Sequence, residues 1–389
     1  MLFRSGLPNG REAVSNLESL SRSYVNSAGQ VIYRDDYFDL SGLTWSTAAN
    51  LGVEGVNYYR TTYSYNKQGL LEREQGPTGT ITFSVYDGMR RLSSTWIGTN
   101  DSTANGQKWS PSNNTGSSNL VQVAAYTYDA NGVGNSNLTQ SVALPGIGAN
   151  RVSEFAYDWR DRQVMSKSGV EAVEAESVNR QVSWQSYDNL SQVISRAQYD
   201  GDGVSISGDG DDDGVPDAPD AAKRRRFSRS FYDNQGRMFR GQEYLVDQGS
   251  GEVYDVKLQS DSWFDKRGNT IQSTRPNGPA SQFQFDGAGR QILSATVGNV
   301  PSGTWADARS LTNSVLLEQL ETSYDNNGNT IQSTTRQRFH DADPSATGAL
   351  GTASSGIRAR VSTSTAYYDA ADRQTASVDL GTKIGRAHV

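Results

Sequence analysis

The feature that most constrains this chain is a short motif that recurs ten times. Each copy begins with an aromatic residue that is usually followed by Asp. Two variable positions come next, then usually Gly, and then Arg or Asn in most copies. Nine copies carry Asp at the second position, and the copy at Tyr65 carries Asn66. Val25 and Phe38 open two degenerate early copies. Tandem recurrence of this kind predicts a repeat architecture. The ten copies begin at Tyr65, Tyr86, Tyr128, Tyr157, Tyr187, Tyr232, Phe264, Phe285, Tyr324 and Tyr368.

The motif predicts a tight turn between two strands. An Asp at the first turn position can accept hydrogen bonds from the backbone beyond it, and Gly at the fourth tolerates a positive φ. The combination predicts a type I turn followed by a glycine bulge. Asp161 and Asp372 replace Gly in two copies and tolerate the same conformation, whereas Arg90 and Ser191 break the pattern. The remaining six copies have Gly69, Gly132, Gly236, Gly268, Gly289 and Gly328.

The segments between the turns favour strands. Alternating polar and apolar residues follow several copies, and 19 Tyr suit extended structure with much polar surface. Helical periodicity is nearly absent, and Ala306 to Leu320 is the best helix candidate. We therefore predict an all-β fold in which the turns join antiparallel neighbours. The motif arginines are expected to pair with nearby Asp or Tyr residues; they are Arg91, Arg162, Arg237, Arg290 and Arg373.

This pattern resembles the YD repeats of the RHS family, which also occur in teneurins. The resemblance extends from about Val25 to Leu380. It implies an antiparallel sheet that spirals into a hollow shell, which in bacteria encloses a C-terminal toxin or effector and in animals forms an adhesion protein. The family's core motif Tyr-Tyr-Asp-Pro-x-x-Gly-Arg-Phe is only partly matched by Tyr367 to Arg373, because Ala370 replaces Pro and Asp372 replaces Gly. We interpret this segment as an ordinary repeat.

Both ends of the chain look foreign. Residues 1–5 and 383–389 are encoded by two largely reverse-complementary strings that resemble a sequencing adapter read from each side. We therefore expect residues 6–382 to be an interior fragment of the shell, with open sheet edges and with the toxin and self-cleaving regions beyond it. Such edges are expected to make the fragment associate.

Residues 200–221 form an acidic insertion between the copies at Tyr187 and Tyr232. The stretch from Asp200 to Asp220 contains eight Asp and no basic residue, and four basic residues follow from Lys223. One interpretation is a solvated acidic loop whose charge the basic run partly balances. The other is a structural calcium site, since the spacing matches the ligand positions of a calcium loop. Its ligands would be Asp209, Asp211, Asp213, the carbonyl of Val215, Asp217 and Asp220, with Gly214 at the bend.

The calcium interpretation also rests on a resemblance to the loops of thrombospondin type 3 repeats. Three features depart from an EF-hand: Pro216 follows Val215, Asp220 stands where Glu is usual, and no helix is predicted before the loop. The expected role of a bound ion is to fold the insertion.

The sequence favours a structural protein over an enzyme. An Asp repeated in every turn is expected to form that turn, because acid–base pairs need two differently perturbed carboxylates. We find no nucleotide-binding, zinc-protease or nucleophile-elbow motif, and His340 has no evident catalytic partner. Seven Trp could stack on sugars, although packing between strands is favoured; they include Trp45, Trp96, Trp109, Trp159 and Trp263.

Two function classes stay open, and a third, a carbohydrate-active β-enzyme, is disfavoured because the carboxylates are bound in turns. The first is a shell segment that encloses or presents a C-terminal effector of the same polypeptide. The alternative is a cell-surface adhesin that binds glycans or proteins, and both imply secretion or display on a cell surface. Near-neutral charge outside the insertion argues against nucleic-acid binding, and no apolar stretch is long enough to span a bilayer.

Overall fold

The computed structural model describes residues 18–44, 51–131, 134–171, 174, 180–299 and 305–382. These residues divide into two units, one comprising residues 1–182 with 201–217 and the other residues 183–200 with 218–389. The proposed adapter residues, 1–5 and 383–389, lie outside the described residues, as does Trp45. Their assignment stays a prediction.

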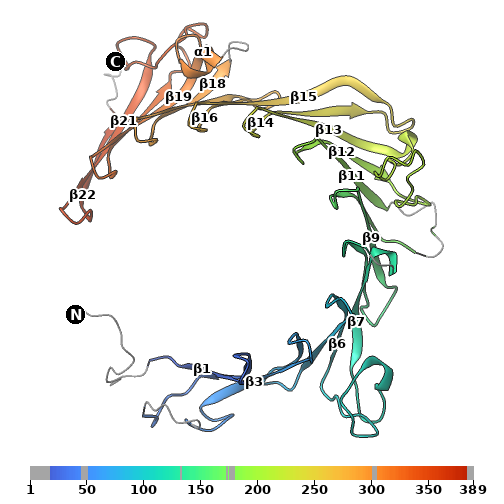
Figure 1. Ribbon diagram of the computed structural model, residues 1–389. Coiled ribbons are helices and arrows are strands. Elements are labelled where there is room, and N and C mark those ends of the chain that lie inside the picture. Colours follow the sequence, from blue (N-terminus) through green and yellow to red (C-terminus); the bar gives the residue numbers. More distant parts are fainter. Residues whose placement is uncertain are drawn as a thin grey trace. The chain divides into compact units, whose positions relative to one another are not determined.

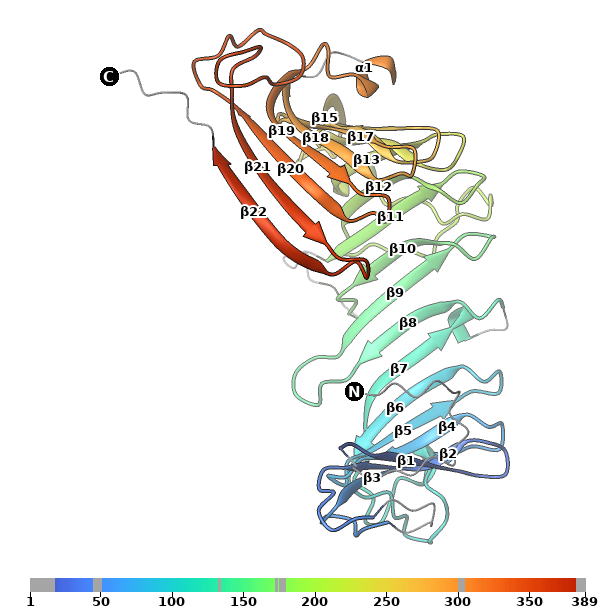
Figure 2. The same ribbon diagram turned by 90° about the vertical axis from the view of Figure 1, so that its left-hand side faces the viewer.

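In the first unit the strands pair antiparallel in chain order, each with the next (Figure 1). Figure 2 shows β5 to β10 side by side. The strands are β1 (Ser21–Val25), β2 (Val31–Tyr37), β3 (Tyr58–Tyr65), β4 (Leu71–Gln75), β5 (Ile81–Tyr86), β6 (Leu92–Gly98), β7 (Val121–Tyr128), β8 (Leu138–Ala143), β9 (Arg151–Tyr157) and β10 (Gln163–Ser168). β11 (Gln181–Tyr187) follows and lies mostly in the range of the second unit.

The second unit repeats this arrangement, again antiparallel and in chain order. Its strands are β12 (Val193–Asp200), β13 (Arg224–Tyr232), β14 (Met238–Val246), β15 (Val253–Phe264), β16 (Thr270–Ser273), β17 (Ala280–Phe285), β18 (Gln291–Asn299), β19 (Val315–Tyr324), β20 (Thr330–Arg338), β21 (Ala359–Tyr368) and β22 (Gln374–Thr382). The prediction of an antiparallel all-β fold is confirmed.

Helical structure is sparse among the described residues. It consists of α1 (Trp305–Arg309) and three single-turn 3₁₀ segments, η1 (Pro111–Asn113), η2 (Asp129–Asn131) and η3 (Ala221–Lys223). The predicted helix over 306–320 is therefore mostly wrong, because Val315 begins strand β19. Pairing with β18 and complete burial of Leu316 outweigh the local helical pattern there. None of the described helices is long and apolar enough to cross a membrane.

The motif turns and the other connections lie at opposite strand ends. A motif copy ends each odd-numbered strand from β3 onward and connects it to the following even-numbered strand. Since neighbouring strands are antiparallel, the motif turns within a unit gather along one edge of its sheet. The longer connections, including residues 99–120 and the acidic insertion, leave from the other edge.

A small core covers one face of each sheet. In the first unit, Trp109 and Leu120 from the β6–β7 connection pack on Ile81 and Phe83 of β5. Gly98 permits this approach, because a Cβ there would lie 2.8 Å from the Leu120 side chain. In the second unit, residues of β17 and β18 pack against two connecting loops through Ala280, Leu293, Ala295, Val297, Leu311 and Leu350. One-sided cores explain why so few aliphatic residues suffice.

Candidate functional site

All motif turns except the one after Tyr128 share one hydrogen-bond pattern, which the Asp286 copy illustrates. The amide of Gly289 donates to the Asp286 carbonyl, and the amide of Asp286 donates to the Arg290 carbonyl. The Asp286 carboxylate accepts from the backbone amides of Ala288 and Arg290, each at 2.9 Å. The strand register shifts at Phe285, as expected for a bulge next to a type I turn. The predicted turn is therefore confirmed.

Among the described residues, the fourth turn position has a positive φ whether Gly, Asp, Arg or Ser occupies it. Arg90 and Ser191, which break the sequence pattern, have φ values of 69° and 64°. Both turns keep the same hydrogen bonds to Asp87 and Asp188. Because these two residues cost more than Gly in this conformation, the side-chain and backbone bonds of the Asp hold the turn.

The Tyr128 copy departs from the prediction. The backbone amide of Asp129 donates to the carbonyl of Asn137, eight residues on, and the Asp129 carboxylate accepts from the amides of Ser136 and Asn137. The loop is thus longer than in the other copies, and Gly132 lies outside the described residues. Asn26 forms a regular turn after Val25. Phe38 opens no hairpin turn, because the long connection of β2 to β3 begins there.

Tyrosine hydroxyls connect successive copies. The hydroxyl of Tyr232 donates to the Val193 carbonyl at 3.0 Å, and that of Tyr324 to the Gln291 carbonyl at 2.9 Å. In each case the acceptor lies immediately after the preceding motif turn. Tyr65, Tyr86 and Tyr157 make the same bond to Val31, Leu71 and Leu138.

The motif arginines connect copies in the opposite direction. Arg290 binds Asp286 of its own turn at 2.7 Å, and its guanidinium lies 4.8 Å from the ring centre of Tyr324 in the next copy. Arg237 similarly binds Asp233 and stacks on Phe264. The expected pairing of motif arginines with Asp and Tyr is therefore confirmed. Each of these motif copies therefore closes a turn and also contacts the next copy along the chain.

The repeated carboxylates have similar electrostatic environments. The side-chain hydrogen bond from Arg237 lowers the pKa of Asp233, and the backbone bond from Arg290 lowers that of Asp286. At Asp158 burial raises the pKa, but hydrogen bonds from Arg162 outweigh it. These three pKa values all shift in the same direction, so the turns supply anions that hold structure together.

The acidic insertion is anchored by buried charges that sequence reasoning missed. Lys167 and Arg180 are each only 3% exposed. The Lys167 ammonium donates to Glu174 at 2.8 Å and to the Val204 carbonyl at 2.7 Å. Arg180 binds Asp202. These contacts fasten residues 202–204 of the insertion to β10 and to the connection that follows it. The partners are far apart in sequence, and no motif marks them.

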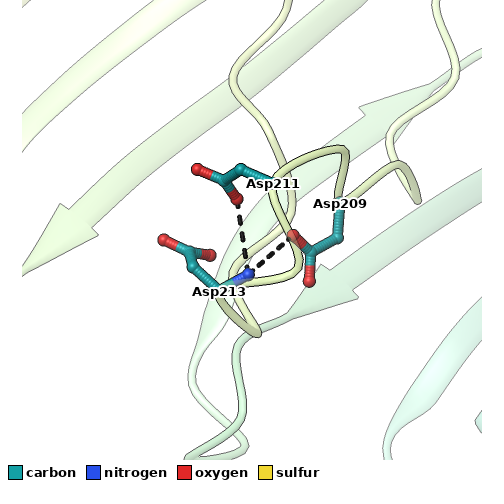
Figure 3. Close-up of side chains that lie close together, drawn as sticks. All are labelled: Asp209, Asp211 and Asp213. Carbon is teal, nitrogen blue, oxygen red and sulfur yellow. Dashed lines mark hydrogen bonds between the residues drawn. The ribbon is translucent and has the colours of Figure 1, made fainter.

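Three of the predicted calcium ligands lie together. One carboxylate oxygen from each of Asp209, Asp211 and Asp213 lies within 4.8 Å of the others, and all three residues are exposed (Figure 3). The backbone amide of Asp213 donates to Asp209 at 3.2 Å. Repulsion from Asp213 raises the pKa of Asp211, with smaller contributions that include Asp217.

The other predicted ligands are placed differently. Asp217 accepts from the amide of Gly210 at 2.7 Å, and the amide of Val215 donates to Asp213. Asp220 caps the 3₁₀ segment η3 through the amide of Ala222. It does not belong to the group of three, and it lies in the range of the other unit. The carbonyl of Gly214 accepts from the backbone amide of Trp159 at 2.8 Å, which docks the loop on a motif turn.

Two of the tryptophans follow the packing interpretation. Trp96 and Trp109 contact each other in the first unit, with ring centres 5.3 Å apart. Trp159 is 69% exposed at a motif turn. His340 is exposed in the connection between β20 and β21.

Comparisons with known proteins give weak structural similarities. No family model matches the chain. No curated protein matches it either. A crystal structure of TcdB2-TccC3-Cdc42 is similar with a TM-score of 0.35 and 12% identity, covering 93% of this chain and 19% of that chain. A Photorhabdus luminescens Tc holotoxin pore gives a TM-score of 0.32 and 12% identity over 93% and 19%. The chain thus spans about a fifth of these toxin chains.

A porin-like protein from Bacteroides uniformis gives a TM-score of 0.21 and 12% identity, covering 62% of this chain and 82% of that chain. Identities and TM-scores this low do not place the chain in a family.

Proposed function

We propose that this chain is a non-catalytic wall segment of a repeat shell that encloses or presents an effector domain of the same polypeptide. The observation that carries the proposal is the set of contacts that each motif copy makes with its neighbours. In each unit, aspartates close the turns, tyrosine hydroxyls bind the preceding copy, and motif arginines stack on the next. A repeated element whose polar groups are used for contacts between copies is suited to extending a sheet.

The sheet itself supports a wall. Within each unit the strands form a single layer, and the small core lies under loops on one face. The lowered pKa values of turn aspartates do not provide the differently perturbed carboxylate pair that acid–base catalysis needs. An adhesin is the alternative, and no contact in the described residues specifically favours it. We also propose that the protein is secreted or displayed on a cell surface, which both functions would require.

The test is to sequence the gene beyond both ends and express the chain with the segments that flank it. If the proposal holds, a folded downstream domain resists protease while attached to the repeats and is degraded when expressed alone. A downstream anchor with no enclosed domain, together with binding of the repeats to cell surfaces, would favour the adhesin.

We also propose that the insertion binds one structural Ca²⁺ at Asp209, Asp211 and Asp213. The convergence of three exposed carboxylates and the raised pKa of Asp211 support a cation there. Asp217 and the carbonyl of Val215 would complete the oxygen shell, whereas Asp220 would have to leave its cap to join. Calorimetric titration with calcium should give saturable heat that Asp209→Ala and Asp213→Ala remove. If the double variant binds calcium as tightly as the unaltered chain, the insertion is only a solvated acidic loop.

A further inference from the structure

A cavity of about 610 Å³ lies in the second unit, between two consecutive motif turns and helix α1. Its volume falls in the range of small-molecule sites. The lining includes the tips of the turns at Asp265 and Asp286, the strand residues Ile271 and Ile292, and Trp305 and Arg309 of α1.

The walls of this cavity are fixed by contacts of α1 with the sheet. The Trp305 indole N–H donates to the Phe264 carbonyl at 2.8 Å. The buried side-chain amide of Gln282 donates to the carbonyls of Asp307 and Ser310, at 3.2 and 3.4 Å. Ala308, between these contacts, is only 2% exposed. These contacts hold the α1 wall in place without a ligand, which lowers the cost of ordering that wall on binding.

Three cations line the cavity: Lys266, Arg267 and Arg309. In the described part of the chain, none of the three forms an ion pair with a carboxylate. Arg267 reaches across to the next motif turn, where its Nη1 donates to the Gly287 carbonyl at 2.5 Å. Its Nε and Nη2 groups make no hydrogen bond to the described residues. The guanidinium of Arg309 lies 4.6 Å from the ring centre of Trp305.

The two carboxylates of the lining are already engaged. Asp286 is bound by Arg290 and by the backbone of its own turn. Asp265 accepts from the backbone amides of Arg267 and Asn269 and from the Asn269 side chain. The neutral donors leave the charge of Asp265 in place, so the lining holds three cations against two carboxylates, of which Asp286 is paired with Arg290. The net charge of the lining is positive, beside an apolar wall of indole and isoleucine.

We propose that this cavity binds a phosphate monoester carried on a ring, either a sugar phosphate or a nucleoside monophosphate. Guanidinium and ammonium groups together match a doubly charged phosphate. The ring lies against Trp305, Ile271 and Ile292, because aromatic and aliphatic groups there favour an apolar ring face. This site is independent of the proposed shell function and adds a ligand to it.

Calorimetric titration of the full 389-residue chain with AMP and with glucose 6-phosphate tests the proposal, with adenosine and glucose as neutral controls. At least one ester should bind at least about tenfold more tightly than its neutral control, as expected from a charge-assisted hydrogen bond. The tighter ester identifies which source of the phosphate the site prefers. Higher salt should weaken binding.

The variants Lys266→Ala and Arg309→Ala should each weaken the ester at least about tenfold. Lys67→Ala is the matched control, since Lys67 occupies the same turn position in the first unit, outside the cavity. It should bind like the unaltered chain. Circular dichroism checks the fold of each variant, and if Arg309→Ala unfolds, Lys266→Ala decides.

Three results would overturn the proposal. One is no saturable heat with either ester up to about 10 mM. A second is inorganic phosphate binding as tightly as the esters, which would show that the ring makes no contact. The third is equal weakening by Lys67→Ala and Lys266→Ala.

Discussion

Burial should decide how much each motif turn contributes to stability. Asp158 and Asp369 form the same turn, and each pairs with an Arg four residues later. The Asp158 side chain is 1% exposed and that of Arg162 is 18% exposed, against 28% for Asp369 and 79% for Arg373. We compare Asp158→Ala with Asp369→Ala.

The Asp158 carboxylate accepts from the amides of Arg160 and Arg162 and from the Arg162 guanidinium. Removing one member of a buried pair costs about 3 kcal/mol or more, because the other charge loses its compensation. An exposed pair in high dielectric contributes little. Asp158→Ala should therefore lower the free energy of unfolding by about 3 kcal/mol. Asp369→Ala, which loses two backbone hydrogen bonds and an exposed ion pair, should lower it by only about a third as much.

Urea unfolding followed by circular dichroism measures the difference. With urea m-values of about 1–3 kcal/mol/M, the midpoint of Asp158→Ala should fall by about 1 M or more. Asp158→Asn should lie between, because an amide oxygen still accepts the two backbone bonds and the ion pair is lost. Equal losses at both sites, or none at Asp158, would refute the argument from burial.

Three further outcomes are expected. Tyr232→Phe should cost about 1 kcal/mol in urea unfolding by removing its bond to Val193; an unchanged midpoint would contradict this. Hydrogen bonds from Lys167 and Gly203 outweigh burial and lower the pKa of Glu174 from 4.5, so its stabilisation is full above that pH and lost as pH falls through the folded pKa. Thermal melts of Glu174→Gln should show a weaker acid dependence. Val378→Lys on edge strand β22 should reduce association in sedimentation, and unchanged association would exclude that edge.

Local chemistry made the turns predictable. The aromatic–Asp pattern predicts them because the carboxylate, the positive φ and the bulge all lie within six residues. The turns with Arg90 and Ser191 at the fourth position also form, because the carboxylates of Asp87 and Asp188 accept the same backbone hydrogen bonds. The Tyr128 copy could not be predicted, since Asp129 closes its loop on Asn137, at a distance that nothing in the pattern specifies.

Contacts between distant segments could not be predicted from the sequence. The spacing of Asp209, Asp211 and Asp213 indicated their convergence, but the cap at Asp220 depends on the chain direction after the insertion. The sequence by itself determined the antiparallel turns, because their hydrogen bonds are local. Only the tertiary structure decided that Lys167 and Arg180 anchor the insertion and that α1 closes a cationic cavity over two turns. Those arrangements depend on burial and pairing between residues that are separated by whole strands. A local sequence pattern does not specify such contacts.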